Sequence, residues 1–285
     1  MYKFSLILCT INRVDTIKEF MEQLSNQEYM NFELIIVDQN LDDRLNVIID
    51  SYKEKYKIIH IKSERGLSKA RNKGLKYITG DIIAFPDDDC IYPKETLRKV
   101  NEFFNNNTYD ILSIKMTNSI KTGRKIQEKE KNQEINRKNI MKLVGSISLF
   151  IKSDVVNKIG GFNEDLGLGS HTIFQGGEDY DYPLRAIKQG CRIYYNKNIE
   201  VLHPWDDSTT DKEKRLEDRA YNGGAAEMYI LNIHEYGSMY KICRIIRRII
   251  IIIYYLIKLD LYKAKLSYRI LQGMIQYYSY RNEVN

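Results

Sequence analysis

The first ninety residues alternate short apolar runs with segments in which apolar residues recur on one face of a helix. The apolar runs have the length of buried strands, and in the first helical segment Ile17, Phe20, Met21 and Leu24 fall on one face. This pattern predicts strands over residues 4–10, 32–38, 57–61 and 81–85, separated by helices over 14–24, 45–56 and 67–77. Strands that alternate with helices in this way predict an α/β fold with a doubly wound, mostly parallel sheet and flanking helices.

Polar residues follow the carboxyl ends of the predicted strands. Thr10 ends the first strand and Asn12 follows it, Asp38 ends the second strand, and the run 87–89 follows the fourth. Because the carboxyl ends of parallel strands meet at one edge of the sheet, and ligands of doubly wound folds bind there, we expect these side chains to converge on a binding site.

The remaining chain predicts further elements and a change of architecture. Helices are expected over 97–104, 153–159 and 180–189, and strands over 111–114, 144–152, 191–195 and 200–202. The polar stretch 115–138 has no clear periodicity and is expected to be a loop or a lid near an acceptor. From about residue 210 the pattern is wholly helical. We therefore expect a catalytic domain over 1–210 and a helical C-terminal extension over 211–285.

The extension contains an isoleucine run at 249–253 with basic residues on both sides, namely Arg244, Arg247, Arg248 and Lys258. The apolar stretch is about nine residues, well short of the ~20 that a membrane-spanning helix requires. A helix of this kind can lie in a membrane interface. It can equally pack on the catalytic domain or on another subunit, and the sequence leaves these alternatives open.

Composition narrows the range of functions. With 43% hydrophobic and 29% charged residues, the chain is typical of a globular protein. The net charge of +6 suits a phosphorylated substrate or anionic lipid, and no nucleic-acid-binding motif is present, so a nucleic acid polymer is not an expected partner. The four cysteines are widely separated, and a strand-like segment at the beginning leaves no room for a signal peptide. Both features favour a cytoplasmic protein.

The run Asp87-Asp88-Asp89 is the first candidate for chemistry. Adjacent carboxylates repel one another unless positive charge lies among them, and Mg²⁺ or Mn²⁺ binds through one or two carboxylates together with substrate phosphates. The alternative is a solvated acidic turn or a helix cap. The position at the end of a buried strand favours a metal and phosphate site.

Three other features are candidates with alternatives. In the run 176–181, which reads Gly-Gly-Glu-Asp-Tyr-Asp, a carboxylate can act as a general base, or the acidic residues can simply stabilise the first turn of a helix. His203 follows a strand and is either a metal or phosphate ligand or a surface group. The segment 66–74, with Lys69 and Arg71, can hold phosphate or ribose, but it is neither a P-loop nor a dinucleotide fingerprint.

Four segments in order resemble the family 2 glycosyltransferases. They are FSLILCTINR at 4–13, LIIVDQNLDD at 34–43, GLSKARNKGL at 66–75 and IAFPDDDCIYP at 83–93, and a Glu-Asp pair follows them. The resemblance extends over residues 3–205. It implies a GT-A fold, a nucleotide-diphosphate sugar donor (a UDP-sugar is favoured), a Mn²⁺ or Mg²⁺ ion, and inversion at the anomeric carbon.

The resemblance also implies roles for individual residues. In the nucleotide pocket it places Thr10, Asn12, Arg13, Asp38, Arg71, Asp87 and Asp88. Among these residues, Asp38 is the one that is implied to contact the base. In the metal site it places Asp89, Asp87 and His203. Asp179 matches the catalytic base, and Glu178 assists or contacts the acceptor. Cys9, Ile11 and Gln39 depart from the residues more usual at their positions, which weakens any statement about the base that is recognised.

The expected function is therefore transfer of a sugar to an acceptor hydroxyl in the assembly of a bacterial surface polysaccharide or glycan. The expected partners are a glycan or lipid-linked acceptor, the inner face of the membrane and a second copy of the chain. A non-catalytic sensor or scaffold that binds sugar nucleotides is one alternative. A membrane-surface assembly factor is another, and a third is a nucleotidyltransferase, although residues 9–18 lack the expected glycine- and arginine-rich phosphate loop.

Overall fold

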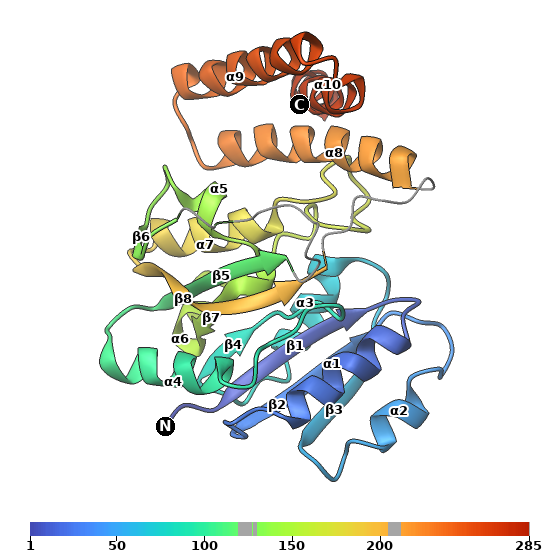
Figure 1. Ribbon diagram of the computed structural model, residues 1–285, viewed down its shortest axis with the longest axis vertical. Helices are drawn as coiled ribbons and strands as arrows, with labels where there is room; N and C mark the ends of the chain where they lie inside the picture. Colours follow the sequence, from blue (N-terminus) through green and yellow to red (C-terminus); the bar gives the residue numbers. More distant parts are fainter. Residues whose placement is uncertain (119–126, 128–129, 205–211, 285) are drawn as a thin grey trace. The chain divides into compact units, whose positions relative to one another are not determined.

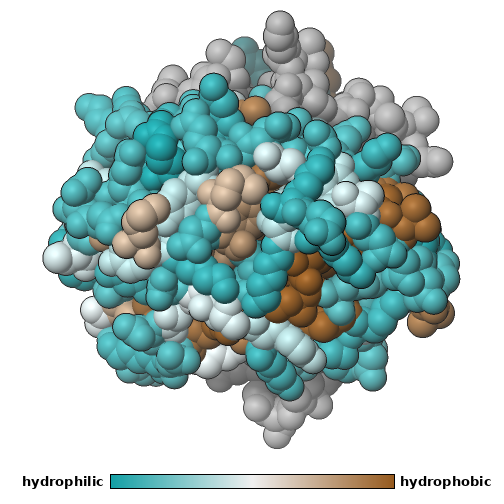
Figure 2. Space-filling model, turned by 90° about the horizontal axis from the view of Figure 1, so that it is seen from below, coloured by the Kyte–Doolittle hydropathy of each residue, from teal (hydrophilic) through white to brown (hydrophobic). Residues whose placement is uncertain are grey.

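The computed structural model describes residues 1–118, 127, 130–204 and 212–284. The chain forms two compact units. The first comprises the described residues of Met1–Phe162 and Tyr182–Asp206, and the second those of Asn163–Asp181 and Asp207–Asn285. On the face of the molecule shown in Figure 2, hydrophilic residues predominate and smaller apolar patches lie among them, as is usual for a globular protein.

The first unit is built on one mixed sheet with flanking helices (Figure 1). Its strands are β1 (Phe4–Thr10), β2 (Phe32–Asp38), β3 (Lys57–Lys62), β4 (Ile82–Ala84), β5 (Ile111–Asn118), β6 (Gln133–Ile135), β7 (Leu149–Lys152) and β8 (Ile193–His203). Its helices are α1 (Asp15–Ser25), α2 (Asn46–Asp50), α3 (Leu67–Leu75), α4 (Thr96–Asn106), α5 (Ile140–Leu143) and α6 (Ser153–Ile159), and it also contains most of α7 (Glu178–Lys188).

The strand order β3-β2-β1-β4-β7-β5-β8-β6 places the N-terminal strands at one end of the sheet. Strands β1 to β4 pair in parallel, as do β5 and β8, whereas β7 runs antiparallel to β4 and β5, and β6 runs antiparallel to β8. All seven residues of β2 are buried, as expected of a parallel strand covered on both faces. The apolar face of α1 packs on one face of the sheet in the main core, and α3 lies against β1 and β2. The mostly parallel α/β sheet predicted from the sequence is confirmed.

Four local predictions differ from the structure, and the first is the helix expected over 45–56, which is the shorter α2, Asn46–Asp50. The two strands expected at 191–195 and 200–202 are one strand, β8, because the polar residues between them form a bulge where the pairing with β5 shifts register. The strand expected over 144–152 is a 3₁₀ turn (Ser146–Ser148) followed by β7. The stretch expected to be a loop at 115–138 contains the end of β5 and all of β6, and its residues 119–126 and 128–129 lie outside the described part.

The buried carboxylate of Glu33 connects neighbouring segments by hydrogen bonds at the amino edge of the sheet, opposite the edge that carries the candidate site. The side chain of Glu33 in β2 has no exposed surface, and it accepts hydrogen bonds from Ser5, Thr79, Lys3 and Lys57 at 2.7 to 3.2 Å. Burial opposes ionisation of this carboxylate, but the hydrogen bonds from Lys57, Ser5 and Thr79 outweigh it and lower the pKa of Glu33 to about 2.

The depressed pKa of Glu33 predicts acid-sensitive stability. The ordinary pKa of 4.5 applies in the unfolded chain, so the group stabilises the fold fully above that pH, and the contribution is lost as pH falls toward 2. We expect Glu33→Gln to lower the free energy of unfolding at neutral pH by about 3 kcal/mol and to flatten its decrease in acid. Chemical denaturation across pH measures both. The exposed Glu54, changed to Gln, is the control, and an unaltered acid profile in Glu33→Gln would contradict the assignment.

The helices of the second unit are α8 (Lys212–Ile233), α9 (Ser238–Ile257) and α10 (Leu261–Val284), and α10 packs against both α8 and α9 (Figure 1). The unit also contains the segment before α7, whose Phe174 stacks on Tyr229 of α8 with ring centroids 4.4 Å apart. No described helix is both long enough and apolar enough to cross a membrane.

Two adjacent glycines of α8 give a matched test of the contact with α10. A Cβ atom on Gly224 would lie 2.0 Å from the carbonyl oxygen of Ile270, whereas one on Gly223 would meet nothing within 4 Å. We expect Gly224→Ala to destabilise the protein by about 1–3 kcal/mol through overpacking, because backbone rather than a movable side chain blocks the site. Gly223→Ala is expected to be neutral or to stabilise α8 by up to about 1 kcal/mol. Thermal unfolding of the two variants checks this, and equal effects would mean that the helices do not approach closely there.

Candidate active site

Asp87, Asp88 and Asp89, here called the acidic run, lie in a turn between β4 and an isolated β-bridge to β8. The backbone amide of Cys90 donates to the carbonyl of Asp87 at 3.2 Å, and Ile91 and Leu202 then exchange backbone hydrogen bonds of 2.8 and 2.9 Å. Since His203 directly follows Leu202, this bridge brings its imidazole to the acidic run. Nε2 of His203 lies 3.1 Å from Oδ1 of Asp89.

Thr10, the last residue of β1, and Arg13, just beyond it, contact the carboxylates of Asp88 and Asp89. Thr10 donates its hydroxyl to Oδ2 of Asp88 at 2.6 Å. The guanidinium of Arg13 reaches both neighbouring carboxylates, with Nη1 2.7 Å from Oδ1 of Asp88 and 2.5 Å from Oδ2 of Asp89. The convergence at this edge of the sheet, expected from the strand ends, is present in the structure for these residues.

The three carboxylates differ in their electrostatics. Burial raises the pKa of Asp87 and of Asp88, and neighbouring carboxylates add to the increase. Burial also opposes ionisation of Asp89, but the hydrogen bonds and charges of His203 and Arg13 outweigh it and lower the pKa of Asp89 to about 2. The site therefore contains one strongly ionised carboxylate and two that are costly to ionise without additional positive charge.

Asp87, Asp89 and His203 form a candidate metal-binding group. One ligand atom from each residue lies within 4.8 Å of the other two, so a single ion can be reached by all three. Two carboxylates and one imidazole fit a divalent ion such as Mn²⁺, and the cost of ionising the buried acidic run falls when such an ion is present. The donor set thus fits the metal that the resemblance implies.

Arg71 lies behind the acidic run on α3. Its side chain is almost completely buried, and the guanidinium lies over the rings of Phe85 and Phe162 at 5.7 and 5.4 Å from their centroids. Nη2 is 3.7 Å from Oδ1 of Asp87. The side chain of Asn72 fixes Phe162 by hydrogen bonds to both its backbone amide and its carbonyl, at 2.6 and 3.0 Å. Arg71 is therefore a buried charge that neutralises part of the acidic run.

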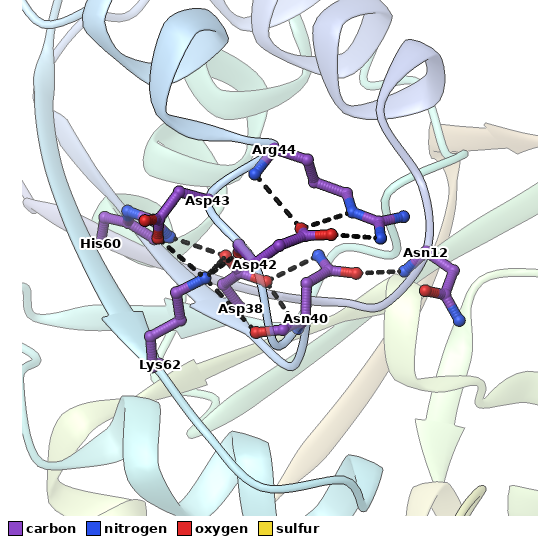
Figure 3. Close-up of polar contacts among 8 residues, drawn as sticks. All are labelled: Asn12, Asp38, Asn40, Asp42, Asp43, Arg44, His60 and Lys62. Carbon is purple, nitrogen blue, oxygen red and sulfur yellow. Dashed lines mark hydrogen bonds and ion pairs between the residues drawn. The ribbon is translucent and has the colours of Figure 1, made fainter.

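Asp38, at the end of β2, is the centre of a second polar network (Figure 3). Its Oδ1 accepts hydrogen bonds from the backbone and side-chain amides of Asn40 at 2.8 and 2.7 Å, and its Oδ2 lies 3.1 Å from His60 and 3.0 Å from Lys62. Burial opposes ionisation of Asp38, but these hydrogen bonds outweigh it and lower its pKa. Both oxygens of Asp38 are thus engaged inside the protein.

Asn40 links this network to the end of β1. Its Oδ1 accepts the backbone amide of Asn12 at 2.7 Å, and Asn12 has a φ of 57°, which is unusual for a residue other than glycine (Figure 3). The backbone amide of Gln39 also donates to the carbonyl of Thr10 at 3.0 Å. The structure therefore connects the Asp38 network with the strand end that carries Thr10 and Arg13.

Asn40, His60 and Lys62 were not among the residues singled out from the sequence. Asp38 and Lys62 are register partners of parallel strands β2 and β3, and His60 lies two residues earlier on the same side of β3. Strand register could have identified both side chains. Nothing in the sequence signalled that Asn40 would fold back onto Asp38.

Glu178 and Asp179 belong to the second compact unit, at the start of α7. Gly177, directly before the helix, has a φ of 89° and lies against Ile230 of α8, where an added Cβ would be 3.2 Å from its side chain. The buried Asp181 lies 2.9 Å from Nε2 of His234, at the end of α8. The negative charge of Asp179 and burial raise the pKa of Tyr180. These contacts fix the first turn of α7 within its unit.

Comparison with known proteins gives the family. The family model described as "Glycosyl transferase family 2" matches residues 5–155, more than half of the chain. An uncharacterized glycosyltransferase of Haemophilus influenzae is 28% identical over 207 residues, which cover 70% of this chain and 67% of that protein. The poly(ribitol-phosphate) beta-N-acetylglucosaminyltransferase TarS of Staphylococcus aureus is 33% identical over 121 residues, 41% of this chain. The aligned segment spans only 21% of TarS.

Solved structures show the same fold. TarS 1–349 in complex with UDP-GlcNAc matches 99% of this chain and 92% of its own with a TM-score of 0.62 at 20% identity. The mannosyltransferase PcManGT from Pyrobaculum calidifontis, in complex with GDP-Man and Mn²⁺, matches 97% of this chain and 87% of its own with a TM-score of 0.63 at 14% identity. The GT-A-type fold and the glycosyltransferase class expected from the sequence are confirmed. The chain therefore belongs to glycosyl transferase family 2.

Proposed function

We propose that this protein transfers a sugar from a nucleoside-diphosphate sugar to an acceptor hydroxyl, with inversion at the anomeric carbon. The observation that carries the proposal is the meeting of Asp87, Asp89 and His203 at the carboxyl edge of the sheet, with ligand atoms within 4.8 Å of one another. A nucleoside diphosphate is a highly charged leaving group, and this is the part of the fold where such ligands bind.

A Mn²⁺ or Mg²⁺ ion is proposed to be held by Asp89, Asp87 and His203. When bound, it would neutralise charge on the phosphate oxygens of the leaving group. The complex of PcManGT with GDP-Man and Mn²⁺ supports a metal in a related fold, and the UDP-GlcNAc complex of TarS supports a UDP-sugar as donor. We favour a UDP-sugar on this basis.

The residues around the metal candidates are proposed to bind the nucleotide. Arg13, which already contacts two carboxylates, offers its remaining N–H groups to phosphate. Thr10 orients Asp88 toward the ribose side of the pocket, and Arg71 supplies a fixed buried positive charge. Asn12 and the Asp38 network form the part of the pocket that receives the base. Because both oxygens of Asp38 are engaged, we assign it to positioning Asn40 and Lys62 rather than to a direct contact.

Asp179 is proposed to be the general base that accepts the proton of the acceptor hydroxyl as it attacks the anomeric carbon, and Glu178 is proposed to assist it. Attack from the face opposite the leaving group inverts the configuration. In this proposal residues 1–210 form the catalytic domain, and residues 211–285 form an extension that associates with membrane or with a second copy of the chain.

The acceptor is proposed to be a glycan or a lipid-linked glycan in the assembly of a bacterial surface polysaccharide. The activity named for TarS, that of a poly(ribitol-phosphate) N-acetylglucosaminyltransferase, supports this class of acceptor. The place of action is proposed to be the cytoplasm at the inner face of the membrane.

The experiment that tests the proposal measures nucleoside diphosphate release from UDP-, GDP- and TDP-sugars with Mn²⁺, with Mg²⁺ and with EDTA. We expect metal-dependent release from one donor class. Calorimetry on the same samples measures nucleotide binding without an acceptor. Absence of any metal-dependent nucleotide binding would refute the proposal even if the acceptor is missing from the assay.

A further inference from the structure

Helix α9 turns its apolar side outward. None of its residues is buried. Eight large apolar side chains are between 41% and 75% exposed and lie on one face of the helix, namely Met239, Ile242, Ile246, Ile249, Ile250, Ile253, Leu256 and Ile257. Leu259 and Leu261, at the turn between α9 and α10, are also mostly exposed. The helix is about 30 Å long, so this outer face is a continuous apolar surface.

The opposite face of α9 carries charge and faces the rest of the second unit. Nε of Arg244 is 2.5 Å from a carboxylate oxygen of Glu227 on α8, and Nζ of Lys241 donates to the side chain of Asn232 at 2.7 Å. Partial burial lowers the pKa of Arg248. This is the reverse of an ordinary surface helix, which buries its apolar stripe and exposes its charges. The second unit therefore directs these polar contacts of α9 inward. Ile245, Ile251 and Ile252 are partly buried, and the other isoleucines of the helix are exposed.

The charged side chains of this region all have the same sign. Residues 238–259 contain five basic side chains and no Asp or Glu. Arg247 and Lys258 lie at the edge of the apolar face and are exposed, and Tyr254, more than half exposed, lies beside them. Basic residues at the rim of an apolar face can extend to anionic headgroups while the isoleucines enter the acyl region, and tyrosine suits the boundary between the two.

We propose that the outer face of α9 lies in the surface of a bilayer that contains anionic lipid. The apolar side chains would insert into the acyl region of the bilayer. The basic side chains at the rim of the face would be attracted to the anionic headgroups. A spanning arrangement is excluded for the described helices by their length and polarity. A second copy of the chain fits the face less well, because pairing two outer faces would bring together Arg247 and Lys258 of both copies, with no acidic group from residues 238–259 between them.

This inference deepens the proposed function by naming the chemistry of a partner, and it is tested without donor or acceptor. The full-length protein is mixed with phosphatidylcholine vesicles and with vesicles of phosphatidylcholine and phosphatidylglycerol, and the bound fraction is measured by flotation. We expect binding to the anionic vesicles at least about tenfold stronger than to the neutral ones, and weaker at high salt.

Two sets of substitutions separate insertion from charge. Ile246→Ser, Ile250→Ser and Ile253→Ser together remove the centre of the face, and they are expected to reduce binding at least about tenfold while circular dichroism stays unchanged. Arg247→Gln with Lys258→Gln is expected to remove most of the preference for anionic lipid. Leu41→Ser with Val47→Ser, two exposed apolar residues of the first unit, is the matched control and should bind as the parent does.

Either of two results would overturn the inference. Equal binding to neutral and anionic vesicles would show that the basic residues do not attract the protein to anionic lipid. Absence of vesicle binding, together with a concentration-dependent dimer in light scattering that the triple isoleucine variant abolishes, would assign the face to a second copy. Because neither measurement uses a sugar nucleotide, both results leave the proposed transferase activity untouched.

Discussion

Replacing Asp89 by Ala is expected to lower metal-dependent sugar transfer by about a hundred- to a thousandfold. Asp89 is the strongly ionised member of the acidic run, and it contacts both His203 and Arg13. Its loss would remove a proposed metal ligand and release the two side chains that it orients. The effect should appear in kcat and in the affinity for Mn²⁺, measured by calorimetry in the presence of nucleoside diphosphate.

Two further variants make the test of Asp89 specific. Asp89→Asn keeps the shape and a hydrogen-bonding oxygen but removes the charge, so it should lose metal affinity nearly as fully as Asp89→Ala. Asp154→Asn, an exposed carboxylate on α6 of the same unit, should retain full activity. If Asp89→Ala kept both metal affinity and turnover, the assignment of the metal site to this run would be wrong.

Most of the N-terminal half of the fold could be predicted because β1, β2 and β4 are buried on both faces. β4 is an uninterrupted apolar run, and β1 and β2 are mostly apolar apart from Ser5, Glu33 and their polar last residues. The helices between these strands show one apolar side. The later strands were harder. In β8 the polar residues of a bulge resembled a turn, and the polar end of β5 resembled a loop, because both are stabilised by long-range pairing rather than by local preference.

The candidate site could likewise be predicted from the sequence only in part. Thr10, Asp38 and the acidic run could be placed at one edge because strand ends converge there. The contact between Asp89 and His203 joins residues more than a hundred positions apart, and only the resemblance to a family indicated it. The roles of Asn40, His60 and Lys62 depend on register and on a local fold-back, which periodicity does not report. The outward isoleucines of α9 were visible in the sequence, but the direction in which they face was not.

Replacing Asp179 by Asn is expected to lower kcat by about a hundred- to ten-thousandfold while the affinity for donor stays unchanged. The substitution removes the proposed proton acceptor but keeps a polar side chain in the first turn of α7, where a negative charge is worth only about 0.3–1 kcal/mol to the helix. A large loss of turnover could therefore not be ascribed to unfolding of α7. Transfer kinetics with saturating donor, together with calorimetry of nucleotide binding, measure the two effects separately.

Comparison with Glu178→Gln and Asp218→Asn assigns the role of Asp179. Glu178→Gln should have a smaller effect on kcat and a larger one on the KM of the acceptor if Glu178 assists or contacts the acceptor. Asp218→Asn changes an exposed carboxylate on α8 of the same unit, and this variant should keep the kcat and KM of the parent. A sensor that only binds sugar nucleotides would show donor binding and no turnover in all four proteins, the parent included. If Asp179→Asn turned over as fast as the parent, the general base would have to be sought elsewhere, and the buried Asp181 is disfavoured for that role because its carboxylate already pairs with His234.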